Sequence, residues 1–236
     1  MMKAMQKSAC ALAILATTTL PALADSVDFT VKGTITPSAC VPTIAGGGAI
    51  DYGDIKAEKL SPDNYTVLDV KSVEFSINCD APTKVAIKAI NNRAGSNATG
   101  EEGIGGAAIS PAGLRFFGNQ SSLPVTGLGL DGTTKIGGYA TRFTLTAIAD
   151  GVAATTLRSI DDKNTWLAQS VSQPLYGTDT LAHLSWTKTN AGTEPEALTT
   201  LSAEMDIQAY INKTSELDLS KPVELDGSTT IELVYL

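Results

Sequence analysis

Few side chains in this sequence could act in catalysis. The single histidine, His183, lies in the alternating segment TLAHLSWTK, a pattern typical of a strand. A general base at this position is conceivable, but a lone histidine in an alternating segment is more typical of a structural or surface residue. The sequence contains no Gly-x-Ser-x-Gly elbow, no phosphate-binding loop and no His-Glu-x-x-His zinc motif. We therefore expect no enzymatic activity.

Two acidic pairs and two tryptophans are the other candidates. The pairs at 101–102 and 161–162 could bind calcium, but neither has the alternating oxygen ligands of a calcium loop, so solvated turns are expected. Trp166 and Trp186 could line a ligand groove, although packing in or beside a core is the stronger expectation. The sequence predicts neither a metal site nor a cofactor.

The first 24 residues have the three parts of a secretory signal peptide. Lys3 and Lys7 are followed by the apolar run ACALAILATTTL and by small residues that predict cleavage after Ala24. Because the apolar run is shorter than the roughly 20 residues needed to span a bilayer, export is predicted rather than anchoring. Cys10 lies inside this segment and would be removed with it.

The net charge limits the classes of partner that this chain could bind, and the cysteine content indicates the kind of compartment in which it folds. The formal net charge is −8, and basic patches suited to nucleic acid or an anionic membrane surface are not expected at that balance. Cys40 and Cys79 are the cysteines that follow the signal. In an exported chain such a pair predicts a disulfide, whereas a metal site would need more ligands than the sequence offers.

Period-two patterns dominate the remaining sequence and predict an all-β fold. The clearest alternating segments are 27–36, 67–79, 83–90, 139–149, 199–211 and 229–236. Segment 151–169 fits either a short helix followed by a strand or two short strands. With no linker between distinct halves, we expect one two-sheet sandwich domain.

Glycine is concentrated in one part of the sequence. Residues 95–138 hold 12 of the 21 glycines, which predicts a Gly-rich insertion between two strands. A flexible surface excursion is the favoured interpretation, and a binding loop is the alternative.

The first alternating segment, SVDFTVKGTITPSAC, begins two residues after the predicted cleavage site. One face carries Val27, Phe29, Val31, Gly33 and Ile35, and the other is polar. A glycine within a strand costs up to about 1 kcal/mol of backbone entropy. Gly33 therefore indicates either a close approach of the backbone to a bulky group or a simple bulge.

This segment resembles the N-terminal extension of pilin subunits from the chaperone–usher pathway. In that family the pattern Gly-x-[Val/Ile]-x-x-x-x-Cys joins the extension to the first strand, and Gly33 to Cys40 has this spacing. The loop from Cys40 to Cys79 is similar to the loop closed by the family's disulfide between its first two strands.

The C-terminal segment TTIELVYL resembles the family's last strand, with alternating Ile231, Leu233 and Tyr235. The chain is longer than an ordinary pilin, and it lacks the family's glycine at the expected distance before the C-terminus. In length it looks more like a divergent group of fimbria-associated exported proteins.

The resemblance implies an immunoglobulin-like sandwich of the incomplete, pilin type, which a strand from a neighbour completes. Residues 1–24 would be the signal peptide, 25–37 the donor-strand extension and 38–236 the sandwich domain. The extension's apolar face, Val27 to Ile35 with Gly33, would enter a neighbour, and Ile231, Leu233 and Tyr235 would line the acceptor groove and chaperone-binding edge.

The implied partners are a periplasmic pilus chaperone, an outer-membrane usher and other pilus subunits. The implied role is a structural or accessory subunit that contributes to adhesion, in transit through the periplasm and then on a cell-surface fimbria. Two alternatives remain open at this point: a single-domain adhesin that binds a host ligand through 95–138 or the tryptophans, and a periplasmic protein in which 27–36 completes its own sandwich.

Overall fold

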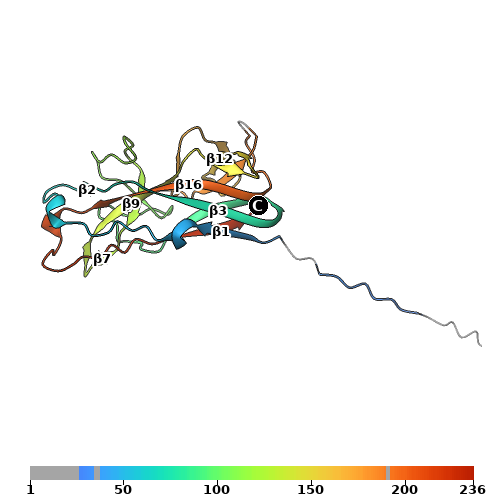
Figure 1. Cartoon of the computed structure of the whole chain (residues 1–236), viewed down its shortest axis with the longest axis horizontal. Helices are drawn as coiled ribbons and strands as arrows, with labels where there is room; N and C mark the ends of the chain where they lie inside the picture. Colours follow the sequence, from blue (N-terminus) through green and yellow to red (C-terminus); the bar gives the residue numbers. More distant parts are fainter. Residues whose placement is uncertain (1–26, 35–37, 190–191) are drawn as a thin grey trace, which may run out of the picture. The chain divides into compact units, whose positions relative to one another are not determined.

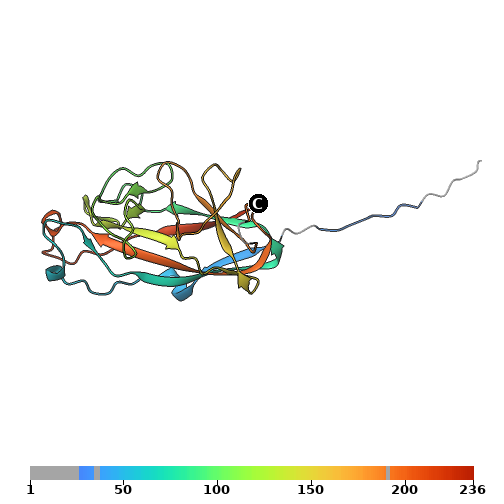
Figure 2. The same ribbon diagram turned by 90° about the horizontal axis from the view of Figure 1, so that it is seen from above.

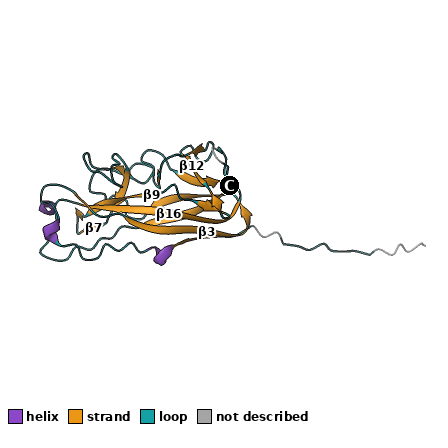
Figure 3. Cartoon of the chain, turned by 45° about the horizontal axis from the view of Figure 1, so that its top comes forward, coloured by secondary structure: helices purple, strands orange, loops and turns teal. Residues whose placement is uncertain are grey.

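The computed structural model describes residues 27–34, 38–189 and 192–236. Contacts divide the chain into a unit that ends at Thr36 and a second unit, Pro37–Leu236, which holds all the strands described below. Within the described residues, the helical segments are three short 3-10 turns, Ala45–Gly48, Ala57–Lys59 and Thr214–Glu216 (Figure 3). The predicted all-β class is confirmed.

The larger sheet, sheet A, contains ten antiparallel strands. Its main path runs in the order β1-β3-β16-β9-β6-β5, and Figure 1 shows β1, β3, β16 and β9 side by side. These strands are β1 (Cys40–Ile44), β3 (Lys71–Thr83), β5 (Ala108–Ile109), β6 (Pro124–Gly127), β9 (Gly137–Phe143) and β16 (Leu198–Ile211). The shorter strands β2 (Thr66–Val67), β10 (Ile148–Ala149), β11 (Val152–Ala153) and β14 (Gln173–Pro174) pair at its margins.

The second sheet, sheet B, has five strands in the order β13-β12-β15-β4-β17. They are β4 (Val85–Asn91), β12 (Thr155–Ser159), β13 (Leu167–Ala168), β15 (His183–Thr187) and β17 (Thr229–Tyr235). A separate hairpin joins β7 (Leu130–Asp131) to β8 (Thr134–Lys135). Viewed from above in Figure 2, the last strand of the chain lies beside the green-cyan strand β4, with which it pairs.

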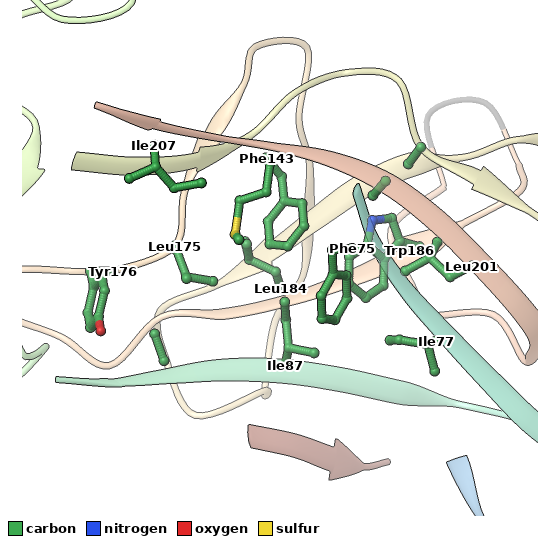
Figure 4. Packing of buried hydrophobic residues seen from close by; sticks show 14 of the residues in the cluster. Phe75, Ile77, Ile87, Phe143, Leu175, Tyr176, Leu184, Trp186, Leu201 and Ile207 are labelled. Atoms are coloured by element: carbon green, nitrogen blue, oxygen red, sulfur yellow. The ribbon is translucent and has the colours of Figure 1, made fainter. Parts of the chain in front are cut away.

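The core lies between the two sheets (Figure 4). Phe75 of β3, Phe143 of β9 and Trp186 of β15 meet at its centre, with ring centroids 5.4 to 6.5 Å apart. Trp186 is fully buried here, as one of the two alternatives for the tryptophans predicts. Aromatic side chains of this size each remove a large apolar area from water, so this cluster stabilises the contact between the sheets.

The central strand β16 follows the predicted alternation, but its second face is also covered. Leu201, Met205 and Ile207 point into the core, as their shared parity predicts. Tyr210, of the opposite parity, packs with Phe116 in a second apolar cluster. A strand buried on both faces can still carry a clear period-two pattern when one cover comes from a loop region.

That cover is the Gly-rich region, which is built into the folded domain and is not a surface excursion as favoured from the sequence. Phe116 and Val125 are fully buried against Tyr210. Close backbone packing explains part of the glycine content: a Cβ on Gly105 would meet the carbonyl oxygens of Gly177 and Thr180 at 2.4 Å. Only glycine fits such an approach.

Two predicted strands are interrupted, and the ambiguous segment is resolved. Segment 67–79 divides between β2 and β3, and 139–149 divides between β9 and β10. Segment 151–169 forms the short strands β11, β12 and β13, without the helix that was one alternative. β11 and β13 sit at sheet margins, whereas β12 lies between β13 and β15 in sheet B.

The predicted disulfide is confirmed. Cys40 and Cys79 are direct partners in the register of β1 and β3, and their sulfurs are bonded. Residues 27–34 of the first unit contain no strand, and Val27, Phe29 and Val31 are 93%, 88% and 85% exposed. The predicted signal peptide and Ile35 lie outside the described residues.

Candidate functional site: an open groove between two edge strands

The two sheets of the domain are left open along one side, between β1 and β17. β1 is the edge of sheet A and β17 is the edge of sheet B. β17 pairs with β4 along its whole length, from Thr229 to Tyr235, and its other side is unpaired within the described residues. An edge strand of this kind presents free N–H and C=O groups that another strand can pair with.

A groove of about 690 Å³ opens on this side. Its floor is formed by alternate residues of β16, among them Met205, Ile207 and Ile211. Ile44 at the end of β1 and Ile231 of β17 also line it. The groove is therefore a gap in the apolar core, bounded by the edge strands and by the two segments that flank them.

The first flanking segment, residues 48–60, follows β1. Tyr52 fixes it to β16, because its hydroxyl accepts a hydrogen bond from the N–H of Ala209 (3.1 Å) and donates one to the carbonyl of Ile207 (3.3 Å). Burial raises the pKa of the Tyr52 hydroxyl, so it stays protonated and keeps this donor.

The second flanking segment, residues 217–227, precedes β17. Arg93 binds the Asp226 carboxylate through two hydrogen bonds of 2.7 and 2.8 Å, a bidentate arrangement that fixes orientation. Lys221 forms an ion pair with Asp131 at 2.7 Å. Both walls of the groove are thus held in place by the domain, which lowers the ordering cost of binding there.

Three hydroxyl groups meet where β17 begins. Thr229 Oγ1 lies 2.6 Å from the Tyr139 hydroxyl and 2.9 Å from that of Tyr176. Burial raises the pKa of both tyrosines, so the cluster is neutral. Close by on the groove lining, the buried hydroxyl of Thr141 has no hydrogen-bond partner among the described residues. The groove thus has an apolar floor with a few hydroxyl groups, and charged side chains of the flanking segments line its rim: Asp51, Asp54, Lys56, Lys221 and Glu224.

The structure places the predicted acceptor residues differently from one another. Ile231 lines the groove, and Leu233 packs against the core. Tyr235 is 52% exposed, and its hydroxyl accepts a hydrogen bond from the N–H of Cys40 at 2.9 Å. Of the three, only Ile231 contributes to the groove's surface, while Tyr235 spans the gap between the edge strands.

The other candidates for chemistry are in structural positions. His183 is 2% exposed, and burial lowers the pKa of its imidazole, so it is held neutral inside the fold. The carboxylate of Asp161 accepts bonds from the Thr165 hydroxyl and N–H and from Ser159 within its own turn, and these lower its pKa to about 2. Trp166 packs with Leu157 on the outer face of sheet B.

No cluster of three or more His, Cys, Asp or Glu side chains suited to a metal ion occurs in the part of the chain that the structure describes. Its described helical turns are also too short to cross a membrane.

Sequence reasoning did not find the groove walls. Residues 48–60 and 217–227 contribute partly buried side chains to the core, among them Ile50, Val223 and Leu225. In 217–227 the apolar residues share one parity, and this period-two pattern is a signal that could have found that wall: Leu217, Leu219, Val223 and Leu225. Segment 48–60 mixes apolar and charged residues and has no comparable alternating run.

The chain is similar to known proteins, but the names of these proteins state no activity. A family model described as "Protein of unknown function (DUF1120)" matches residues 29–140, from within the extension to β9. In Escherichia coli (strain K12), the uncharacterized protein YhcF is 28% identical over 225 residues, covering 90% of this chain and 92% of the relative. Protein GltF from the same strain is 25% identical over 251 residues, covering 96% and 94%. No solved structure matches the chain.

Proposed function

We propose that this chain is a structural or accessory subunit of a chaperone–usher fimbria, which polymerises by donor-strand exchange and contributes to adhesion. The observation that carries the proposal is the groove beside the free edge of β17, whose floor is apolar. Strand addition to an exposed edge uses main-chain hydrogen bonds for affinity and alternate side chains for specificity. The resemblance at both ends of the sequence supplies the pathway.

The extension has the side chains that such a groove needs. Val27, Phe29 and Val31 alternate along the chain and are almost fully exposed. Burying each would contribute about 1.5–3 kcal/mol before ordering costs. Alternate side chains of a strand point to one face, so all three can enter one groove together.

The open groove and the free edge of β17 also explain why the proposed subunit would require a chaperone before assembly. An empty apolar groove next to a free strand edge is prone to pair with other chains. In the proposed pathway a periplasmic chaperone covers the edge, and the usher passes the subunit to the extension of the next one. No catalytic step or cofactor enters this function.

The test compares two substitutions on opposite faces of the extension in the full mature chain. Phe29→Asp puts a charge on the apolar face, and Thr30→Asp puts the same charge on the polar face. Oligomers that resist SDS without heating should form from the wild type and Thr30→Asp and be absent from Phe29→Asp. A wild-type chain that stays monomeric, or a Phe29→Asp chain that assembles normally, would contradict the proposal.

A second measurement separates assembly between chains from completion within one chain. The Phe29→Asp chain keeps an intact groove, so a labelled peptide of residues 26–36 should bind it at low micromolar or tighter affinity. Wild-type monomers that bind no peptide and unfold when 25–37 is removed would indicate self-completion instead.

A further inference from the structure

The bridge between Tyr235 and Cys40 lies at the end of the open side where the disulfide is. Tyr235 belongs to the edge strand of sheet B and Cys40 to the edge strand of sheet A. The Tyr235 side chain must therefore cross the gap between the sheets to accept the 2.9 Å hydrogen bond from the Cys40 N–H. Ile44 and Ile231, which line the groove, lie toward the opposite ends of the same two strands. A strand that paired along the whole of β17 would run into this side chain.

The backbone on both sides of the bridge is fixed. Cys40 is bonded to Cys79, and the preceding Ala39 donates its N–H to the Asp80 carboxylate (2.9 Å). On the other side, the N–H of Leu236 donates to the carbonyl of Lys84 (3.1 Å), which holds the end of β17 on β4. The half-exposed Tyr235 side chain is therefore the part of the bridge that can move.

The Cys40 N–H that Tyr235 binds is an edge donor. The N–H of Asp80 donates to the carbonyl of Ala39, so Cys40 and Cys79 form a non-hydrogen-bonded pair in the ladder of β1 and β3. In such a pair the N–H groups point away from the partner strand. The Cys40 N–H thus faces the gap, where a carbonyl of an inserted strand could accept from it.

We propose that Tyr235 is a displaceable latch, which closes the disulfide end of the open side between β1 and β17 and rotates away when a strand enters. Its hydroxyl occupies the edge donor of Cys40 until a backbone carbonyl of the inserted strand replaces it. This inference rests on the proposed function, and it adds a residue that controls the rate of strand entry. The hydroxyl group carries the effect, because a phenylalanine ring would fill the same space without the bond.

The test uses the full mature Phe29→Asp chain, whose groove is intact and whose own extension is disabled. Association of the labelled 26–36 peptide is followed by fluorescence anisotropy in this chain and after adding Tyr235→Phe. Loss of one neutral hydrogen bond predicts association that is roughly two- to tenfold faster, with an unchanged dissociation rate. Tyr65→Phe in the same background is the control, because its hydroxyl bonds to Ala98, which does not line the groove.

Amide hydrogen exchange reports on the bond without any peptide. In the Phe29→Asp chain the Cys40 amide should exchange several-fold faster after Tyr235→Phe, while amides in the middle of β3 keep their rates. Equal association rates, or an unchanged Cys40 exchange rate, would overturn the latch. If neither chain binds the peptide, the proposed function itself fails, and the latch fails with it.

Discussion

The hydroxyl of Tyr52 substitutes for a neighbouring strand at one point of β16. Pairing with β3 ends at Ile207 and pairing with β2 begins at Tyr210. Between them, the fully buried Ala209 has its N–H bound by the Tyr52 hydroxyl at 3.1 Å. A groove wall is thus attached to the central strand through a backbone group that would otherwise lack a partner.

Replacing Tyr52 with Phe should lower the free energy of unfolding by about 1–3 kcal/mol, because the Ala209 N–H is left buried without an acceptor. Urea denaturation at neutral pH measures this. Tyr65→Phe, which removes a single 3.3 Å bond to the Ala98 carbonyl, is the matched control and should cost about 1 kcal/mol or less. Equal losses in the two variants would contradict the role given to Tyr52.

Two glycines of the Gly-rich region should respond oppositely to alanine. Gly105→Ala places a Cβ 2.4 Å from two carbonyl oxygens and should destabilise the domain by about 1–3 kcal/mol. Gly100→Ala meets no atom within 4 Å and should be neutral or slightly stabilising. Thermal unfolding monitored by circular dichroism distinguishes them. Similar melting temperatures for both would mean that the region is not packed as described.

Removing one partner of the ion pair between Arg142 and Asp206 should destabilise the domain more than changing both partners together. Their 2.9 Å contact is largely buried, and Asp206 also accepts a bond from Ser72. Arg142→Met leaves the Asp206 charge without its partner and should cost about 3 kcal/mol in urea unfolding. The double variant with Asp206→Asn should recover part of this loss, since no unpaired charge remains. A double variant as unstable as the sum of the two single ones would argue against the coupling.

Asp150 should contribute to the loss of stability in acid. The Lys188 ammonium, together with the N–H groups of Thr199 and Thr200, lowers the pKa of its carboxyl from 3.8 to about 2. A folded-state pKa below the unfolded one gives stability above about pH 4, and this is lost as the pH falls through 2.

Asp150→Asn should therefore reduce stability at pH 6 by about 0.5–1 kcal/mol, because the partly exposed pair is screened by solvent. The difference from the wild type should shrink as the pH falls from 4 to 2. Urea midpoints at several pH values measure it, and Lys188→Met should reproduce the effect. A difference that is independent of pH would refute this account.

The sequence predicted the long strands well, because each has one face in the core between the sheets. β4, β16 and β17 lie within a residue or two of the expected alternating segments. The disulfide was predictable because only two cysteines followed the signal. These features depend on local pattern and composition, which a single sequence displays directly.

The groove could be anticipated only in part. Ile231 was expected on its surface, but the exposed position of Tyr235 and its bond to Cys40 depend on how two distant strands approach each other. The buried role of Phe116 was missed because glycine-rich composition indicates loops and does not reveal which loops pack on a sheet. Which loop packs on which sheet is set by tertiary contacts, and local sequence patterns do not report these.

The pairing of β17 with β4 also determines when the groove can exist. The groove lies between the edge strands β1 and β17, which come from opposite ends of the domain's sequence. Cys40 of β1 and Tyr235 of β17 are 195 residues apart in the chain. The paired residues of β4 and β17 are also far apart in the chain, and such long loops close slowly, so sheet B gains its edge strand late in folding. The groove is therefore complete only when β17 has paired with β4. Under the proposed function, a neighbour's strand could therefore be taken up only after this late pairing has formed.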